Sequence, residues 1–130
     1  MRPPRVWWFA GAMAKANLAQ ALQDKTEVDI TVIGRRTGRE HSTPVWFVRE
    51  GGSVFLLPVG GRRSNWYRNL AKNPSVRLAA DGATYPATAT PITERAAIDH
   101  VLDDFRARYG ASDVDSYYPG QDVAVEVKPR

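Results

Sequence analysis

The sequence predicts a mainly β fold, a small antiparallel barrel with helices packed on its outside. Six segments have the alternating or wholly apolar pattern of strands, and all but the last follow one another in a meander-like order. No βαβ alternation is present, which argues against a Rossmann sheet. The chain also has no internal repeat and no linker. We therefore expect one domain over residues 1–130, with an N-terminal aromatic patch and helix in 1–26 and the barrel with its helices in 27–130.

The first half of the chain is expected to contain one helix and three strands. Ala, Leu and Met recur between polar residues over 12–24, which predicts a helix. Residues 28–34 alternate as a strand does. Residues 43–50 predict a second strand, and a glycine pair then forms a hairpin turn. The third strand, over 53–59, is apolar on both faces and should lie deep in the core.

Two further strands are expected around a short helix in the middle of the chain. Ser64 is a suitable cap for a helix over 65–72, which an Asn-Pro pair ends. Strands over 75–80 and 84–91 flank an Asp-Gly turn.

A long helix and a last strand complete the prediction. Thr93 is expected to cap the helix, with Glu94 in its first turn, and Gly110 to end it. Residues 111–121 are interpreted as a loop, and 122–129 as the sixth strand. The apolar stripe of the helix is Ala97, Ile98, Val101, Leu102, Phe105 and Tyr109. The prediction thus amounts to six antiparallel strands and about three helices.

Composition and charge exclude several classes of protein. There is no cysteine, which excludes disulfides, thiol nucleophiles and cysteine-ligated metals. The two histidines lie far apart, so we expect no metal site. The net charge of +4 is concentrated, because residues 34–72 hold eight Lys/Arg against two Glu, whereas residues 93–130 hold five against eight acidic residues. This local excess of positive charge predicts an anionic ligand.

The charge is densest in the stretch GRRTGRE, residues 34–40. Its two glycines, the second of them Gly38, allow the backbone to turn and to direct N–H groups outward. Arg35 and Arg36 supply forked donors for phosphate or carboxylate, and Thr37 adds a hydroxyl. The spacing is neither that of a Walker A loop nor G-x-G-x-x-G. A merely solvated, charged hairpin loop is the competing interpretation.

The stretch GGRRSNWYRNLAKNP, residues 60–74, indicates a second part of the same site. Gly60 and Gly61 follow an apolar strand, as where a backbone approaches a ligand closely. The following helix would direct its N-terminal N–H groups toward that place. Trp66 could stack on a planar ring or pin the helix to the barrel, whereas packing is favoured for Tyr67.

Together these motifs resemble the deazaflavin-dependent nitroreductase family. The resemblance rests on GRRTGRE at 34–40, Pro-Val-Trp at 44–46, PVGG at 58–61 and NWYRNLAKNPSVRL at 65–78, and it covers about residues 28–80 well. Members of this family are coenzyme F420-dependent oxidoreductases. The resemblance therefore implies a split β-barrel, similar to the FMN-binding split barrels.

The resemblance also implies which residues bind the cofactor. The arginine-rich loop would hold its phosphate and oligoglutamate tail, and the strand end with the Gly-Gly turn and the next helix would hold its ring. The residues concerned are Arg35, Arg36, Thr37 and Gly38 for the tail, Val59, Gly60, Gly61, Trp66, Tyr67, Asn69 and Leu70 for the ring, and His41, Pro44 and Trp46 as further cofactor contacts. Two positions depart from the family pattern, because His41 replaces a more basic residue and Ser64 a proline. His41 could contact the tail or protonate a substrate, but an exposed loop histidine is favoured.

The activity that the resemblance implies is hydride transfer from the reduced cofactor to a small electrophile, such as a quinone, an enone or a nitro compound. Trp46, Trp66 and Tyr109 would form walls on the substrate side, and Tyr109 fits the role of proton donor better than Tyr117 or Tyr118. Two alternatives remain open: an FMN-binding split-barrel reductase or oxidase, and a non-catalytic carrier of F420 or flavin. The excess of arginines favours the longer anionic tail of F420.

A small-molecule electron acceptor is the expected partner, and a nucleic acid is disfavoured by the acidic last third of the chain. An aromatic patch over residues 6–11, with Trp7 and Trp8, is interpreted either as a lid or as a peripheral membrane contact, and the lid is favoured. No stretch of about 18 apolar residues predicts a membrane span. We expect a cytoplasmic protein, free or peripheral to the inner face of the membrane, and either a monomer or a homodimer.

Overall fold

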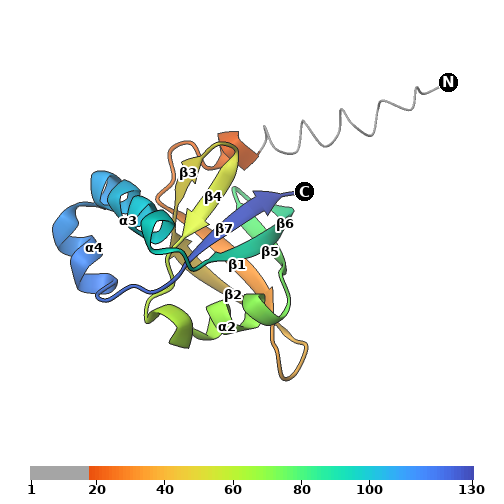
Figure 1. Cartoon of the computed structure of the whole chain (residues 1–130). Coiled ribbons are helices and arrows are strands. Elements are labelled where there is room, and N and C mark those ends of the chain that lie inside the picture. Colours follow the sequence, from red (N-terminus) through yellow and green to blue (C-terminus); the bar gives the residue numbers. More distant parts are fainter. Residues whose placement is uncertain (1–17) are drawn as a thin grey trace.

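The computed structural model describes residues 18–130 and contains a curled sheet of seven antiparallel strands, in the order β2-β1-β5-β6-β7-β4-β3 (Figure 1). The strands are β1 (Glu27–Ile33), β2 (Glu40–Trp46), β3 (Val48–Glu50), β4 (Ser53–Leu56), β5 (Ser75–Ala80), β6 (Ala83–Ile92) and β7 (Ala124–Pro129). The helices are the 3-10 turn η1 (Gly61–Arg63), α2 (Asn65–Lys72), α3 (Arg95–Tyr109) and α4 (Ala111–Tyr117), and residues 18–21 are also helical. The predicted mainly β split barrel with flanking helices is confirmed, although the described residues form seven strands instead of the predicted six.

Two hydrophobic clusters hold these elements together. The first fills the inside of the curled sheet and includes Leu18, Leu22 and Leu70. The helical residues 18–21 lie at one end of the sheet and α2 at the other (Figure 1). The second lies between the sheet and the pair α3 and α4, with Phe105 fully buried at its centre. Helix α2 is therefore anchored in the barrel core, whereas α3 and α4 cover the outer face.

The predicted strand 43–50 is wrong in two respects, since it is two strands and it begins earlier. The β1–β2 register pairs Ile33 with Glu40, so β2 starts three residues before the prediction. The strand breaks at Phe47, whose side chain is fully buried. The backbone N–H of Phe47 donates to the Tyr109 hydroxyl (3.2 Å), and the hydroxyl donates to the carbonyl of Phe47. The Tyr109 side chain of α3 thus satisfies the Phe47 backbone groups, as a neighbouring strand would.

The third predicted strand, 53–59, ends at Leu56 instead. The next residues leave the ladder, because Leu57 packs in the cluster beneath α3 and Pro58 has no N–H to donate. The carbonyl of Pro58 accepts a hydrogen bond from Gly61 (3.0 Å), which starts the turn into η1. Val59, predicted to be in the core, is 61% exposed.

The start of α3 and the segment after it also differ from the prediction. Thr93 does not cap the helix, because the preceding strand β6 continues to Ile92 and the helix begins at Arg95. Glu94 occupies the cap position without a side-chain cap bond, so it is not in the first turn. Gly110 ends α3 as predicted.

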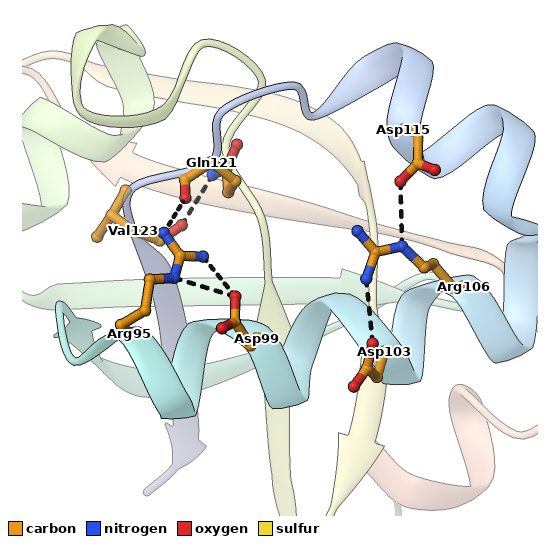
Figure 2. A network of polar contacts seen from close by, with 7 residues as sticks. All are labelled: Arg95, Asp99, Asp103, Arg106, Asp115, Gln121 and Val123. Carbon is orange, nitrogen blue, oxygen red and sulfur yellow. Dashed lines mark hydrogen bonds and ion pairs between the residues drawn. The ribbon is translucent and has the colours of Figure 1, made fainter.

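The predicted loop 111–121 is wrong for its first seven residues, which form α4. Val114 is the fully buried anchor of this short helix. The Arg106 guanidinium of α3 donates to Asp115 of α4 at 3.0 Å and to Asp103 at 3.0 Å (Figure 2). One apolar residue and one ion pair between helices therefore hold a segment that has no helical stripe in its sequence.

Other predictions are confirmed or lie outside the described residues. Helix α2 and strand β5 have the predicted ends. Of the predicted helix 12–24, residues 18–21 are helical, 22–24 form a turn, and the part before residue 18 is not described. The aromatic patch with Trp7 and Trp8 likewise lies outside the described residues. No helix within 18–130 is long and apolar enough to span a bilayer.

The N-terminal cap of α2 offers a test of how this helix is held. The Ser64 hydroxyl accepts a hydrogen bond from the Tyr67 N–H at 3.4 Å. We expect Ser64→Ala to lower the free energy of unfolding by about 1 kcal/mol, because one N–H of the first turn loses its partner. Ser64→Asp keeps an acceptor and should stay close to the original protein. Equal stabilities of Ser64→Ala and the original protein in urea denaturation would contradict the cap.

Candidate functional site

The arginine-rich loop, residues 34–39, joins β1 to β2 and folds as a compact turn. The N–H of Gly34 donates to the carbonyl of Arg39 (2.7 Å), and the N–H of Gly38 donates to the carbonyl of Gly34 (2.9 Å). Gly38 has φ +72°, a left-handed conformation that favours glycine. The Thr37 hydroxyl accepts a hydrogen bond from the N–H of Arg39 (3.2 Å). The backbone is thus satisfied within the loop, and its guanidinium groups are left to face other partners.

The side chain of Asn69 in α2 holds the arginine-rich loop through hydrogen bonds. Its side chain is buried, with 6% exposed, and its Oδ1 accepts from both the backbone N–H (3.1 Å) and the guanidinium (2.8 Å) of Arg35. Both donors come from one residue, so the amide orients the Arg35 side chain as well as its backbone. A residue predicted as a ring contact is therefore seen to hold an arginine of the loop.

The positive charge of this loop is not neutralised within the described chain. Among residues 18–130, no carboxylate lies within ion-pair distance of Arg35, Arg36 or Arg39, whereas arginines elsewhere, such as Arg77, do have carboxylate partners. Partial burial lowers the pKa of the Arg35 guanidinium below its usual value, and the nearby charges of Arg68 and Arg36 lower it further. Such a field attracts an anion.

A cationic cleft of about 510 Å³ lies between this loop and α2. It is lined by Gly34, Arg35, Arg36, Thr37, Arg39, His41, Thr43, Asn65, Trp66 and Asn69. Three of the four predicted tail contacts, Arg35, Arg36 and Thr37, therefore line this cleft together with His41, whereas Gly38 does not. The N-terminal end of α2 also opens into the cleft at Asn65, which adds backbone N–H groups and the positive end of the helix dipole.

An aromatic cleft of about 480 Å³ adjoins the cationic one, because Thr43 and Trp66 line both. Its lining consists of Glu27, Thr43, Pro44, Val45, Trp46, Leu57, Val59, Trp66, Tyr117 and Tyr118. Pro44, Trp46, Val59 and Trp66, all predicted cofactor contacts, meet in this cleft. A largely apolar cleft beside a charged one suits a ligand with a planar ring and a charged tail.

Five predicted ring contacts do not line the aromatic cleft, and one of them, Asn69, lines the cationic cleft instead. Tyr67 and Leu70 point into the barrel core, where they are 8% and 0% exposed, because both lie on the inner face of α2. Gly60 and Gly61 form the turn after Val59 and line neither cleft. The packing that was favoured for Tyr67 is thus observed, and Trp66 packs against the core while also reaching both clefts.

Tyr109, the predicted proton donor, lies behind the aromatic cleft rather than in it. Its ring stacks on Trp46, with centroids 4.4 Å apart and planes 15° apart. Its hydroxyl is surrounded by backbone groups, the N–H and carbonyl of Phe47 and the carbonyl of Thr26 (3.0 Å). Burial raises the pKa of Tyr109. The Tyr109 hydroxyl therefore holds the backbone of Phe47, and the Tyr109 ring supports the ring of Trp46.

Tyr117 and Tyr118 are the tyrosines that line the aromatic cleft. Tyr117 is 53% exposed and meets the Trp46 ring edge-on, with centroids 5.5 Å apart. Tyr118 is buried, and burial together with the neighbouring tyrosines raises its pKa to about 12. Both tyrosines therefore belong to a wall that α4 positions, and the sequence did not predict this helix.

Sequence reasoning missed several lining residues, among them Glu27, Arg39 and Thr43. Arg39 belongs to GRRTGRE, and its charge could have identified it. Glu27 and Thr43 depend on the β1–β2 register, which sets Glu27 opposite Trp46. The register between β1 and β2 depends on the whole hairpin, so no short motif in the sequence predicts it.

One group of side chains within 18–130 has the composition of a metal site: Glu50, His100 and Asp104. The His100 ring nitrogen lies 2.9 Å from Glu50 and 3.4 Å from Asp104, and these carboxylates raise its pKa. All three side chains are substantially exposed and none lines either cleft. The group forms a surface ion pair between β3 and α3.

A protein-family model described as F420H(2)-dependent quinone reductase matches residues 8–127 of the chain. Three solved structures also have a similar fold. An F420-H2 dependent reductase, FDR-A, has 19% sequence identity and a TM-score of 0.63, covering 80% of this chain and 95% of that chain. The heme storage protein HutZ from Vibrio cholerae has 18% identity and a TM-score of 0.70, covering 88% and 89%. A structure described as a domain-swapped dimer has 20% identity and a TM-score of 0.64, covering 97% and 100%.

These structural likenesses, at under 25% identity, show the fold alone, and the fold they share is the predicted split β-barrel. The match to the family model is stronger evidence than these likenesses, because it covers almost the whole chain, including the residues that line both clefts.

The position of the Tyr109 hydroxyl can be tested by removing it. Tyr109→Phe leaves the Phe47 N–H without its partner, so we expect the free energy of unfolding to fall by about 1 to 3 kcal/mol. Tyr117→Phe removes an exposed hydroxyl and should change stability by less than about 0.5 kcal/mol. Thermal and urea denaturation measure both variants, and equal effects would contradict the structural role of Tyr109.

Proposed function

The chain belongs to the F420H(2)-dependent quinone reductase family, and from this premise we propose that it is an F420-dependent oxidoreductase. The proposed reaction is hydride transfer from the reduced cofactor to a small electrophile, such as a quinone, an enone or a nitro compound. The deazaflavin ring supplies the hydride when it is bound, and the protein binds, orients and excludes water.

The observation that carries the proposal is the meeting of two unlike clefts at Trp66 and Thr43. One is cationic and the other largely aromatic, and they adjoin. Coenzyme F420 has the same division, with a planar ring at one end and a phosphate and glutamate tail at the other. Two separate ligands would not need the clefts to share a wall.

The donor set of the cationic cleft fits a tail with several negative charges. Arg35 is held in place by Asn69, and Arg36 and Arg39 have no carboxylate partner among the described residues. A single phosphate would require one forked guanidinium, whereas phosphate and glutamate carboxylates together can use all three. We propose that His41, which lines the same cleft, contacts the tail as a weaker donor.

In the aromatic cleft we propose that Trp66 supports the ring and that Trp46 forms the opposite, acceptor-side wall. Tyr109 stacks behind Trp46 and fixes its plane, which makes Tyr109 a positioning residue in this proposal. Tyr117 and Tyr118 line the cleft, and we propose that one of these phenols donates a proton to the oxygen of a reduced acceptor.

A second candidate function is a carrier that binds F420 or flavin without turnover. It is favoured by the likeness to HutZ, which is described as a heme storage protein. The FMN-binding alternative has no comparable support, since the matching family model is F420H(2)-dependent and FMN has one phosphate for the three arginines of the cationic cleft.

Partners and location are proposed on narrower grounds. The likeness to a domain-swapped dimer supports a homodimer, which light scattering would distinguish from a monomer. A cytoplasmic location agrees with the absence of cysteine from the sequence. The contact of Trp7 and Trp8 with a membrane rests on the sequence alone.

The deciding experiment is a titration of the purified protein with oxidised F420 and, in parallel, with FMN, followed by ring fluorescence. We expect F420 to bind more tightly. Tighter binding of FMN would contradict the proposed cofactor. Reduced F420 is then offered with a quinone, an enone and a nitro compound. Tight F420 binding with no oxidation by any of the three would favour the carrier over the reductase.

The cationic cleft is tested by the double variant Arg35→Ala with Arg36→Ala. We expect F420 affinity to fall by about tenfold to a hundredfold at low salt, because two charge-assisted contacts are lost. The slope of log Kd against log salt should also become shallower, since fewer ions are exchanged on binding.

The matched control is Arg49→Ala with Lys72→Ala, which removes the same net charge from exposed positions outside both clefts. An equal loss of F420 affinity in the two double variants would mean that net charge, and not the cleft, attracts the cofactor.

A further inference from the structure

The segment between α4 and β7, residues 118–123, is here called the strap. It runs beside the Val59–Gly61 turn, although about 60 residues separate the two in sequence. Gln121 is its buried polar residue, with 4% of its surface exposed. A buried amide needs partners, and those of Gln121 join the strap to the turn.

Gln121 holds the first end of the turn. Its Nε2 donates to the carbonyl of Pro58 at 2.9 Å and to the carbonyl of Val123 at 2.8 Å. The Pro58 carbonyl also accepts from the N–H of Gly61, so it is the point at which the chain leaves β4 and turns back. Gln121 thereby ties this point to the start of β7.

Asp122 holds the other end. Its Oδ1 accepts a hydrogen bond from the backbone N–H of Arg62 (3.1 Å), and its Oδ2 lies 3.6 Å from the Arg62 guanidinium. Gly61 lies directly against the same carboxylate, since a Cβ built there would be 2.2 Å from Oδ1. Gly61 also has φ +61°, so both its conformation and its surroundings require glycine.

The strap is itself fixed to α3. The Arg95 guanidinium donates to the carbonyl of Gln121 (2.8 Å) and to Asp99 (Figure 2). The Arg106 contacts with Asp103 and Asp115 hold α4, just before the strap, to the same helix (Figure 2). The turn is therefore fastened through the strap to the helical layer.

The contacts of Gln121 and Asp122 thus connect two parts of the lining of the aromatic cleft. Val59, in the turn, forms part of one wall, and Tyr118, the first residue of the strap, forms part of another. A shift of the turn relative to the strap would change the width of the cleft between them.

We propose that Gln121 and Asp122 are positioning residues, which hold the Val59–Gly61 turn at a fixed distance from the tyrosine wall and so fit the aromatic cleft to a planar ring. The ring would be that of the deazaflavin, so this proposal rests on the proposed function. Neither side chain lines the cleft, and both act through the turn.

The test compares Asp122→Ala with Asp122→Asn. Asparagine keeps an oxygen that can accept from the Arg62 N–H, whereas alanine does not. In the apo protein, amide hydrogen exchange at Arg62 should be faster in Asp122→Ala and close to the original rate in Asp122→Asn. Unchanged exchange in Asp122→Ala would overturn the proposed contact, and this readout needs no cofactor.

The second readout is the affinity for F420 and for its ring fragment, which lacks phosphate and glutamates. Asp122→Ala and Gln121→Met should weaken binding of the fragment about fivefold to tenfold, whereas Asp122→Asn should stay within about twofold of the original protein. Arg130→Gln is the stability control, because it removes the hydrogen bonds of Arg130 to Thr88 and to the carbonyl of Ala87, and Arg130 lines neither cleft.

Fragment binding that falls in Arg130→Gln as much as in Asp122→Ala would overturn the positioning role, since general loosening would then suffice. Faster exchange at Arg62 with unchanged fragment affinity would overturn it as well. If the original protein binds neither F420 nor the fragment, the proposed function fails, and the exchange rates still decide whether Asp122 holds the turn.

Discussion

The contact between Asn69 and Arg35 is the interaction on which the candidate site depends. A buried amide oxygen on α2 must accept hydrogen bonds, and both of its donors come from the arginine-rich loop. Helix α2 is in turn held by Leu70, which is fully buried in the barrel core. Helix α2 thus connects the packed core to the arginine-rich loop and holds Arg35 in place. Without this connection the like charges of the loop would repel one another and move apart.

The placement of charge follows from the cost of removing it from water. The arginines line one of the two clefts that meet at Trp66, and most of the aromatic side chains line the other. A ligand with a ring and a charged tail would therefore meet a cationic environment at one end and a mostly apolar one at the other. Trp66 is the boundary, since its ring packs on the core and lines both clefts.

Local sequence predicts what local forces determine. The ends of α2 were predictable because Ser64 and the Asn73-Pro74 pair mark them, and GRRTGRE was recognisable by its charge alone. The break at Phe47 was not, because its backbone partner is Tyr109, 62 residues away. Helix α4 and the bonds of Gln121 also depend on distant partners. Sequence therefore predicted that Arg35 and Arg36 belong to one region, and both line one cleft, whereas the bond of Asn69 to Arg35 and the place of Tyr109 behind Trp46 follow from the fold.

The central claim is that the ring and the tail of the cofactor bind in separate clefts, the ring by apolar contacts and the tail by charge. The most direct measurement is the affinity of F420 and of its tail-less ring fragment as salt is raised from about 20 to 500 mM, a range over which exposed charges become screened. The account predicts that F420 affinity falls steeply while fragment affinity hardly changes, so that the two converge at high salt. Parallel salt dependence of the two ligands, or equal affinities at low salt, would contradict it.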